Sequence, residues 1–332
     1  MVERLFSFLP PVKASPITGI RSQHGEVEGC FIACPLTAKL MMNMPTNAVI
    51  NKIIRGGRLA ERMGAKILGL GAFTKVVGDA GITVAKNLRI PVTTGNSYTV
   101  ATAVQSVRDA ARLMGHDLKK ASVVIMGATG AIGRVCARIL ARETGNMTLV
   151  AREESRLYET ASEILIDTGL SVNVTSDSKK ALRSGDVVVT VTSALDAVIE
   201  PEDLRPGAVV CDVARPRDVS KRVSEVRDDV LVIEGGVVEV PGDADFHFNF
   251  GFPPRMAYAC MAETMILTLE NRFESYTLGR DLQVDKVVEI AAMAEKHGFK
   301  LAGFRSFGKA LPMEQIEQIK KRVRERYAPE KV

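Results

Sequence analysis

The middle of the chain, from Ala121 to Glu239, alternates short apolar runs with segments of helical periodicity. Apolar and polar residues do not alternate inside the runs, which is typical of parallel strands buried on both faces. The runs cover residues 121–128, 146–153, 170–176, 186–193, 208–214 and 230–239, and helical segments at 131–145 and 155–169, the latter opened by Ser155, separate the first three. This order predicts βαβ units and an α/β fold with a Rossmann-like doubly wound parallel sheet.

The segments on either side have a different pattern. Before Ala121 we expect a helix ending in 56–64, strands in 65–74 and 90–96, and a long helix over 97–115. After Gly251 we expect helices over 253–271 and 284–298 and a charged amphipathic helix over 313–332. We predict a second α/β domain for the substrate in 1–120, a nucleotide domain in 121–250, and C-terminal helices packing across both in 251–332.

A glycine-rich turn joins the first apolar run to the first helix, in "VVIMGATGAIGRVCARIL". Glycines at this place let the backbone approach a pyrophosphate, and the free N–H groups of the helix start stabilise its charge. The strand–turn–helix context makes the motif specific for a dinucleotide. The predicted loop contacts are Gly127, Ala128, Thr129, Gly130, Ala131, Ile132 and Gly133.

The next strand decides which dinucleotide binds. It ends in "LVAREESR", where Arg152, with Arg156 behind it, favours the 2′-phosphate of NADPH over NADH. Glu153 and Glu154 also allow a solvated turn of mixed charge. By fold position, Thr190, Val191 and Thr192 should pass the nicotinamide ribose, and Gly235 and Gly236 should lie near the nicotinamide ring.

Composition excludes several classes of protein. The 332 residues are 46% hydrophobic and 25% charged, and no run is apolar for long enough to span a membrane. The N-terminal apolar run is too short for a signal peptide, so we expect a cytoplasmic protein. The net charge of +5 is spread along the chain without an arginine-rich arm, which argues against nucleic acid. Four scattered histidines predict no metal cluster, and a homo-oligomer is left open.

The five cysteines follow no disulfide or zinc spacing, so reduced thiols are expected. Cys30 and Cys34 are best explained by packing, as are Cys136 and Cys211. Cys260 lies in "PPRMAYACMAETMILTLEN" with Glu263 one turn further on. A cysteine on an apolar helix is usually core filling, whereas a thiolate there would be a strong nucleophile.

Six segments together resemble the cyanobacterial long-chain acyl-[acyl-carrier-protein] reductases: "GAFTKVVGD", "TTGNSYTVATAV", "VVIMGATGAIG", "LVARE", "IEGGVVE" and "RMAYACMAETMILTLE". The resemblance runs from about Glu28 to about Leu301. It implies NADPH-dependent reduction of a fatty acyl thioester to a fatty aldehyde, with acyl carrier protein or coenzyme A as the donor. Cys260 matches the cysteine that carries the acyl group. The stretch "VPGDADFHFNFGFPP" departs from the family, so the acyl chain length stays open.

The resemblance leaves activation of the thiol to be worked out. If Pro253 and Pro254 open the helix, Cys260 lies about two turns inside, beyond the reach of the helix dipole. Glu263 would then accept a proton, or else pair structurally with an arginine, and His247 is a weaker candidate base. Asn96 is expected to hold the carbonyl oxygen, with substrate contacts from Gly71, Thr94, Gly95 and Ser97; the same turn could simply cap the following helix.

Two alternatives remain at this point. The domain arrangement also resembles that of the shikimate and amino-acid dehydrogenases. The first alternative is therefore a shikimate-like dehydrogenase of a small hydroxy or amino acid, in which Lys75 and Asp79 would transfer a proton to the carbonyl oxygen without covalent catalysis. Ordinary surface charge also accounts for these two residues. The second alternative is an NADP-binding regulator with no enzymatic activity.

Overall fold

The computed structural model describes residues 8–194, 196–249 and 251–327. The N-terminal apolar run considered above as a signal peptide begins outside this range. The chain forms two compact units, and each contains two separate stretches of sequence. Unit 1 comprises residues 1–98 and 237–300, and unit 2 comprises 99–236 and 301–332.

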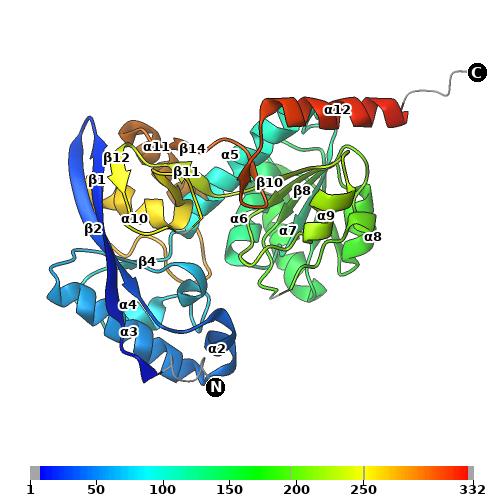
Figure 1. Ribbon diagram of the computed structural model, residues 1–332. Coiled ribbons are helices and arrows are strands. Elements are labelled where there is room, and N and C mark those ends of the chain that lie inside the picture. Colours follow the sequence, from blue (N-terminus) through cyan, green and yellow to red (C-terminus); the bar gives the residue numbers. More distant parts are fainter. Residues whose placement is uncertain (1–7, 195, 250, 328–332) are drawn as a thin grey trace, which may run out of the picture. The chain divides into compact units, whose positions relative to one another are not determined.

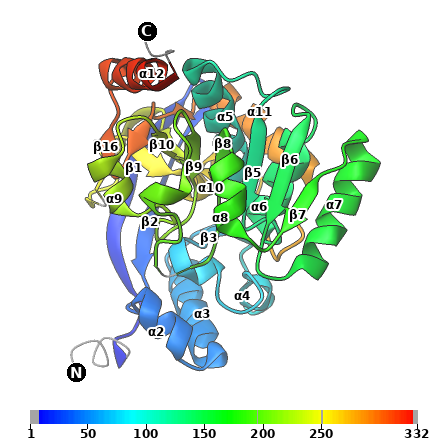
Figure 2. The same ribbon diagram turned by 90° about the vertical axis from the view of Figure 1, so that its right-hand side faces the viewer.

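Unit 2 is built on a six-stranded sheet in the order β10-β9-β8-β5-β6-β7, and all neighbouring strands are parallel. This is the Rossmann strand order, with the first strand, β5, next to the crossover strand β8. Figure 2 shows the strands side by side with helices packed around them. The predicted α/β fold with a doubly wound parallel sheet is confirmed. The strands are β5 (Ser122–Met126), β6 (Asn146–Val150), β7 (Asn173–Thr175), β8 (Val187–Thr190), β9 (Val209–Asp212) and β10 (Leu231–Glu234).

Both faces of this sheet are buried, which explains the unbroken apolar runs. Val124 and Val188 pack with one cluster that includes Leu182 of α8, whereas Cys211 faces the opposite side, where its thiol reaches the carbonyl of Ala103 in α5. The helices are α5 (Asn96–Met114), α6 (Ala131–Leu140), α7 (Glu154–Thr168), α8 (Ser178–Ser184), η2 (Pro201–Asp203), α9 (Lys221–Val226) and α12 (Met313–Tyr327), with a hairpin of β15 (Arg305–Ser306) and β16 (Lys309–Ala310). The predicted opening of α7 at Ser155 is wrong by two residues, because Glu153 occupies the N-cap.

Unit 1 combines two small sheets with helices. The long hairpin of β1 (Val12–Ser22) and β2 (Gly25–Ala33) pairs through β1 with β12 (Gly242–Asp245), as Figure 1 shows in blue and yellow. β11 (Val237–Glu239) lies between β13 (Met256–Tyr258) and β14 (Lys300–Leu301). The predicted strands at 65–74 and 90–96 shrink to the two-residue pair β3 (Leu68–Gly69) and β4 (Val92–Thr93). The helices are α2 (Ala38–Asn43), α3 (Thr46–Arg62), η1 (Ala72–Lys75), α4 (Ile82–Lys86), α10 (Ala259–Leu269) and α11 (Val284–His297).

The division of the chain differs from the predicted three segments. Residues 251–300 belong to unit 1 and residues 301–332 to unit 2, so the expected C-terminal segment is not one body. The reason is pairing: β11 and β13 form an antiparallel ladder that brings the chain after β10 back to unit 1. No helix in the described part of the chain has the length and apolar character needed to cross a bilayer.

Candidate functional site

The first candidate site is the turn after β5 in unit 2. Gly127 has a φ of +79°, and a Cβ there would lie 2.8 Å from the carbonyl oxygen of Val191. Its amide donates to the carbonyl of Val150 at the end of β6. Both the backbone conformation and the close approach of the β8 end therefore require glycine.

The other two glycines of the loop have different roles. A Cβ on Gly133 would lie 2.9 Å from the carbonyl carbon of Gly127, so this glycine lets α6 pack closely on the turn. A Cβ on Gly130, the N-cap of α6, would meet only the Gly127 carbonyl oxygen, at 3.3 Å, and otherwise open space. The first amides of α6, at Ala131, Ile132 and Gly133, have no carbonyl partner inside the helix. An open cradle faced by amides fits a pyrophosphate. Ala128 is fully buried and its amide donates to the carbonyl of Val150, so it packs beneath the turn.

Charged residues follow β6 beside this loop. Arg152 is exposed, and the guanidinium of Arg156 donates to the carbonyl of Thr129 in the loop at 3.5 Å. Glu154 is turned away, because its carboxylate accepts from the amide and the hydroxyl of Ser176 at 2.9 and 2.8 Å. This arrangement places the Arg156 guanidinium at the loop and removes one of the acidic residues that complicated the cofactor prediction.

The segment after β8 is held by a residue that the sequence did not single out. Asp218 is fully buried and accepts from the amide of Thr192 at 2.9 Å and from its hydroxyl at 2.5 Å. It also accepts from the hydroxyl of Thr190. The side chains of Thr190 and Thr192 are therefore committed within the protein, and the amide of Val191 donates to the carbonyl of Met126 at 3.1 Å. No spacing rule would have found Asp218, since it follows β9 in an irregular loop.

Gly235 and Gly236 follow β10, where the sequence placed them. A Cβ on Gly235 would lie 2.7 Å from a methyl group of Val213 and 2.9 Å from the sulfur of Cys211. Gly236 has a φ of +84°. Both are buried, so their backbone conformation and close packing at the end of the sheet account for them without a ligand.

The second candidate site is the start of α10 in unit 1. The prediction that Pro253 and Pro254 open this helix is wrong: α10 begins at Ala259, with Tyr258 as its N-cap. The residues between pair with β11 as strand β13. Cys260 is thus the second helical residue and lies in the first turn, where unpaired amides and the helix dipole stabilise negative charge. Its side chain is partly exposed.

Gly95 lies directly against Cys260. Its φ is +72°, and a Cβ there would lie 2.6 Å from the Cys260 carbonyl carbon and closer still to its oxygen and Cα. The "TTGNS" turn therefore presses its backbone onto the first turn of α10. The structure thus brings together the two segments that carry the family resemblance most specifically.

Two polar side chains flank Gly95 without internal partners. The Thr94 hydroxyl and the Asn96 amide oxygen are buried and find no hydrogen bond among the described residues. Buried polar groups are normally paired, so such an exception calls for an explanation such as a ligand. Ser97 differs, since its fully buried hydroxyl lies 2.9 Å from the Thr277 hydroxyl. Its placement is that of a packing residue.

Glu263 lies one turn after Cys260 and is completely buried. One carboxylate oxygen accepts from the hydroxyls of Thr93 at 2.5 Å and Thr277 at 2.8 Å, and the other from the amide of Tyr98 at 2.9 Å. Burial raises the pKa of Glu263, while these three hydrogen bonds lower it. The proposed pairing with an arginine is wrong, because hydroxyls and an amide occupy the carboxylate. Glu263 thereby fastens the "TTGNS" turn and residue 277 to α10.

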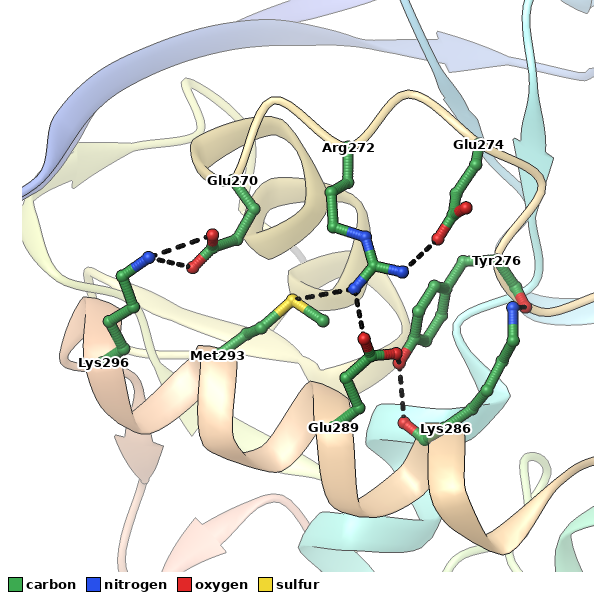
Figure 3. A network of polar contacts seen from close by, with 8 residues as sticks. All are labelled: Glu270, Arg272, Glu274, Tyr276, Lys286, Glu289, Met293 and Lys296. Atoms are coloured by element: carbon green, nitrogen blue, oxygen red, sulfur yellow. Dashed lines mark hydrogen bonds and ion pairs between the residues drawn. The ribbon is translucent and has the colours of Figure 1, made fainter.

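The loop that delivers Thr277 is itself anchored to α11 (Figure 3). Arg272 donates to Glu289 at 2.5 Å and also pairs with Glu274. The Tyr276 hydroxyl lies 2.8 Å from a Glu289 carboxylate oxygen, and the Lys286 ammonium donates to the Tyr276 carbonyl at 3.0 Å. This network fixes the residue next to Thr277 and so orders the buried cluster behind the cysteine.

Gly71, the remaining predicted substrate contact, does not pack against the cysteine helix. Gly71 lies in the turn before η1, and nothing lies within 4 Å of a Cβ added there. Gly69 is the glycine that packs on the cysteine helix, since an added Cβ would lie 3.2 Å from the Cβ of Thr264. His247 is exposed and lies 3.1 Å from the Thr18 hydroxyl, with no described contact to Cys260.

The Lys75 and Asp79 pair is not formed among the described residues. Asp79 instead accepts from the amide and hydroxyl of Thr83 at 3.0 and 2.6 Å, at the start of α4. These hydrogen bonds lower the pKa of its carboxyl even though burial opposes them. Asp79 therefore acts as a local capping residue.

The remaining cysteines differ from Cys260. Cys136 and Cys211 are fully buried, and burial raises the pKa of Cys136 to about 12 and that of Cys211 further. Burial also raises the pKa of Cys34, against the charge of Lys52. No group of three or more potential metal ligands occurs in the described ranges.

Comparison with known proteins supports the assignment of unit 2. Residues 109–234 match the model of the Shikimate / quinate 5-dehydrogenase family. This match lies within unit 2, which is therefore a Rossmann domain of the type that binds NAD(P).

Curated relatives extend the similarity to unit 1. The chain is 31% identical over 326 residues to aminotransferase PigE of Serratia sp. (strain ATCC 39006), covering 96% of this chain but only 37% of that protein. It is 29% identical over 293 residues to the long-chain acyl-[acyl-carrier-protein] reductase of Synechococcus elongatus, covering 83% and 82% of the two chains. It is 31% identical over 179 residues to glutamyl-tRNA reductase of Methanothermobacter marburgensis, covering 50% of this chain and 42% of that protein.

Proposed function

We propose that this protein is an NADPH-dependent reductase that converts a fatty acyl thioester to a fatty aldehyde through an acyl group on Cys260. The observation that carries the proposal is the contact of Gly95 with Cys260, flanked by two buried polar groups without partners. The Synechococcus relative, whose name specifies acyl-carrier-protein thioesters, aligns across both units. Acyl carrier protein or coenzyme A is the proposed donor.

Acyl transfer begins at the start of α10. The Cys260 thiolate attacks the thioester carbon, a new S–C bond forms, the bond to the carrier sulfur breaks, and the carrier leaves as a thiolate that takes a proton from water. In this scheme the Thr94 hydroxyl, the side-chain N–H groups of Asn96 and the first amides of α10 donate to the carbonyl oxygen as it becomes negative, whereas the unpaired Asn96 amide oxygen can only accept a hydrogen bond. Glu263 does not take the proton in this scheme, because its oxygens are engaged with Thr93, Thr277 and Tyr98.

The cofactor fits unit 2 by its geometry. Gly130 leaves open space beside the first amides of α6 for a pyrophosphate, and Arg152 and Arg156 supply positive charge for a 2′-phosphate. When bound, NADPH supplies the hydride that reduces the acyl carbon. Cys260 then leaves as a thiolate, and the product is released as an aldehyde.

The decisive experiment is mass spectrometry after incubation with palmitoyl-coenzyme A without NADPH. We expect one acyl increment on Cys260, and its loss in Cys260→Ser together with loss of aldehyde formation, because serine is a weak nucleophile without a dedicated base. NADPH affinity should stay near the wild-type value. Cys30→Ala and Cys34→Ala serve as controls and should keep turnover. Comparable aldehyde formation by Cys260→Ser, or a label on another cysteine, would contradict the proposal.

A dehydrogenase of a small hydroxy or amino acid is the second candidate, favoured by the match to the shikimate/quinate dehydrogenase family. That match covers the cofactor unit and not the unit that holds Cys260. Turnover of such a substrate by Cys260→Ser would establish this alternative. NADPH binding without turnover of any substrate would instead indicate a regulator.

A further inference from the structure

An arginine-lined hollow lies on unit 1 and is formed by residues that belong to neither candidate site above. Pro10, Pro11 and Leu59 form its apolar part, and Arg55, Arg58 and Arg62 form its charged part, around a cavity of about 290 Å³. The three arginines follow one another at intervals of three and four residues and therefore share one face of α3. We term this the α3 arginine hollow.

Among the residues that the structure describes, no acidic side chain balances the charge of the hollow. None of the three guanidinium groups has a carboxylate within ion-pair distance in the described ranges. Arg134 and Arg138 on α6 provide the contrast, since each pairs with a carboxylate of α7. The one acidic residue of α3, Glu61, accepts instead from the backbone amides of Arg89 and Ile90.

An unbalanced row of like charges is unfavourable for the helix. Arg55 with Arg58, and Arg58 with Arg62, are neighbours of the kind that repel on a helix surface. A bound anion would relieve both repulsions. The guanidinium fork matches the oxygens of a phosphate, and the apolar wall of Pro10, Pro11 and Leu59 lowers the local dielectric and so strengthens the pairing.

We propose that the α3 arginine hollow binds a phosphate group of the acyl donor, so that unit 1 recognises the carrier as well as the acyl group. This proposal rests on the proposed function, because both candidate donors carry phosphate esters on the arm that ends in the thiol. Strand β2 packs against both α3 and α10, so the hollow and Cys260 belong to the same packed unit.

Binding measurements test the hollow without any catalytic step. Isothermal titration of the full chain, with saturating NADP⁺ to fill the nucleotide site, compares coenzyme A with pantetheine, which lacks phosphates. We expect wild type to bind coenzyme A at least tenfold more tightly, with the advantage falling as salt rises. Arg55→Gln/Arg58→Gln should reduce this advantage by about tenfold or more, since a charge-assisted contact is worth roughly that factor. Arg183→Gln, an exposed arginine of α8 without a described partner, is the matched control and should keep it.

Acylation of Cys260 separates this site from the proposed function. Wild type and the double variant should be acylated equally by S-palmitoyl-N-acetylcysteamine, which has no phosphate, while the variant should be slower with palmitoyl-coenzyme A. S-palmitoyl-phosphopantetheine shows whether the single phosphate of the arm suffices or the nucleotide phosphates are needed. An unchanged preference for coenzyme A in the double variant, or no preference in wild type, overturns the hollow as a phosphate site. If no thioester acylates the wild-type protein, the proposed reductase function is overturned instead. The isothermal titration with coenzyme A and pantetheine still tests the α3 arginine hollow in that case.

Discussion

Replacing Gly95 by alanine tests whether the "TTGNS" turn is pressed against the cysteine helix. Two penalties apply at this position. The φ of +72° is left-handed, which costs a residue with a Cβ about 1–2 kcal/mol. The new Cβ would also lie 2.6 Å from the Cys260 carbonyl carbon, and overpacking of this kind costs about 1–3 kcal/mol. We expect Gly95→Ala to lower the free energy of unfolding by roughly 2–5 kcal/mol.

Two other glycines of unit 1 separate these penalties. Gly64 has a φ of +84° with nothing within 4 Å of an added Cβ, so Gly64→Ala should show only the conformational cost of about 1–2 kcal/mol. Gly29 has neither a left-handed φ nor a neighbour within 4 Å, so Gly29→Ala should be close to neutral. Urea unfolding of the three variants gives the comparison.

The functional consequence is measured on the folded protein. Below the unfolding transition, Gly95→Ala should slow acylation of Cys260 on the order of a hundredfold, because a displacement of about 1 Å at a reacting group has that effect. NADPH affinity should not change. Equal destabilisation by Gly95→Ala and Gly64→Ala, with normal acylation, would refute the close contact.

Two further predictions concern the two sites, and a third concerns Asp212, the buried last residue of β9. Arg152→Ala should weaken NADPH about ten- to a hundredfold and NADH far less; equal losses would remove it from the cofactor site. Glu263→Gln should cost about 1–3 kcal/mol of stability, because the glutamine NH2 group only donates and so cannot replace the carboxylate oxygen that accepts from a hydroxyl or an amide, and should slow acylation while leaving NADPH affinity unchanged. Burial raises the pKa of Asp212 to about 6. The free energy of unfolding should therefore fall by about 3 kcal/mol as the pH rises from 4 to 6, because Asp212 ionises in the unfolded chain before it does in the folded protein. Asp212→Asn should make the free energy of unfolding less dependent on pH over this range.

The parallel sheet could be predicted because its signal is local. Strands β8, β9 and β10 are buried along their whole length and β5 along all but its first residue, so the sequence shows unbroken apolar runs between turn residues there. The glycine loop is local too, since Gly127 and Gly133 are required by contacts within a single strand–turn–helix unit. Here propensity, periodicity and turn chemistry all favour the same structure.

The site in unit 1 could be predicted only in part, because its contacts join distant segments. Thr93 and Glu263 are 170 residues apart in sequence, and Tyr98 and Glu263 are 165 apart. Only tertiary packing brings such pairs together, and the hydrophobic periodicity of the sequence carries no information about which distant residues meet. The two-residue strands β3 and β4 show the same effect, since their apolar runs predicted strands of ordinary length.

Helix α10 begins later than predicted, and this changes how the Cys260 thiol can be activated. Two prolines before an apolar run normally indicate a first helical turn, but here Met256 to Tyr258 satisfy their backbone groups with β11 instead. Cys260 therefore lies in the first turn of α10, where the helix itself favours a negative charge. A carboxylate base one turn away is then unnecessary, and a buried Glu263 with three hydrogen bonds suits a different purpose. In the proposed mechanism Glu263 positions the glycine turn beside Cys260, so we expect loss of its carboxylate to slow acylation through geometry and to leave the pH dependence of acylation unchanged.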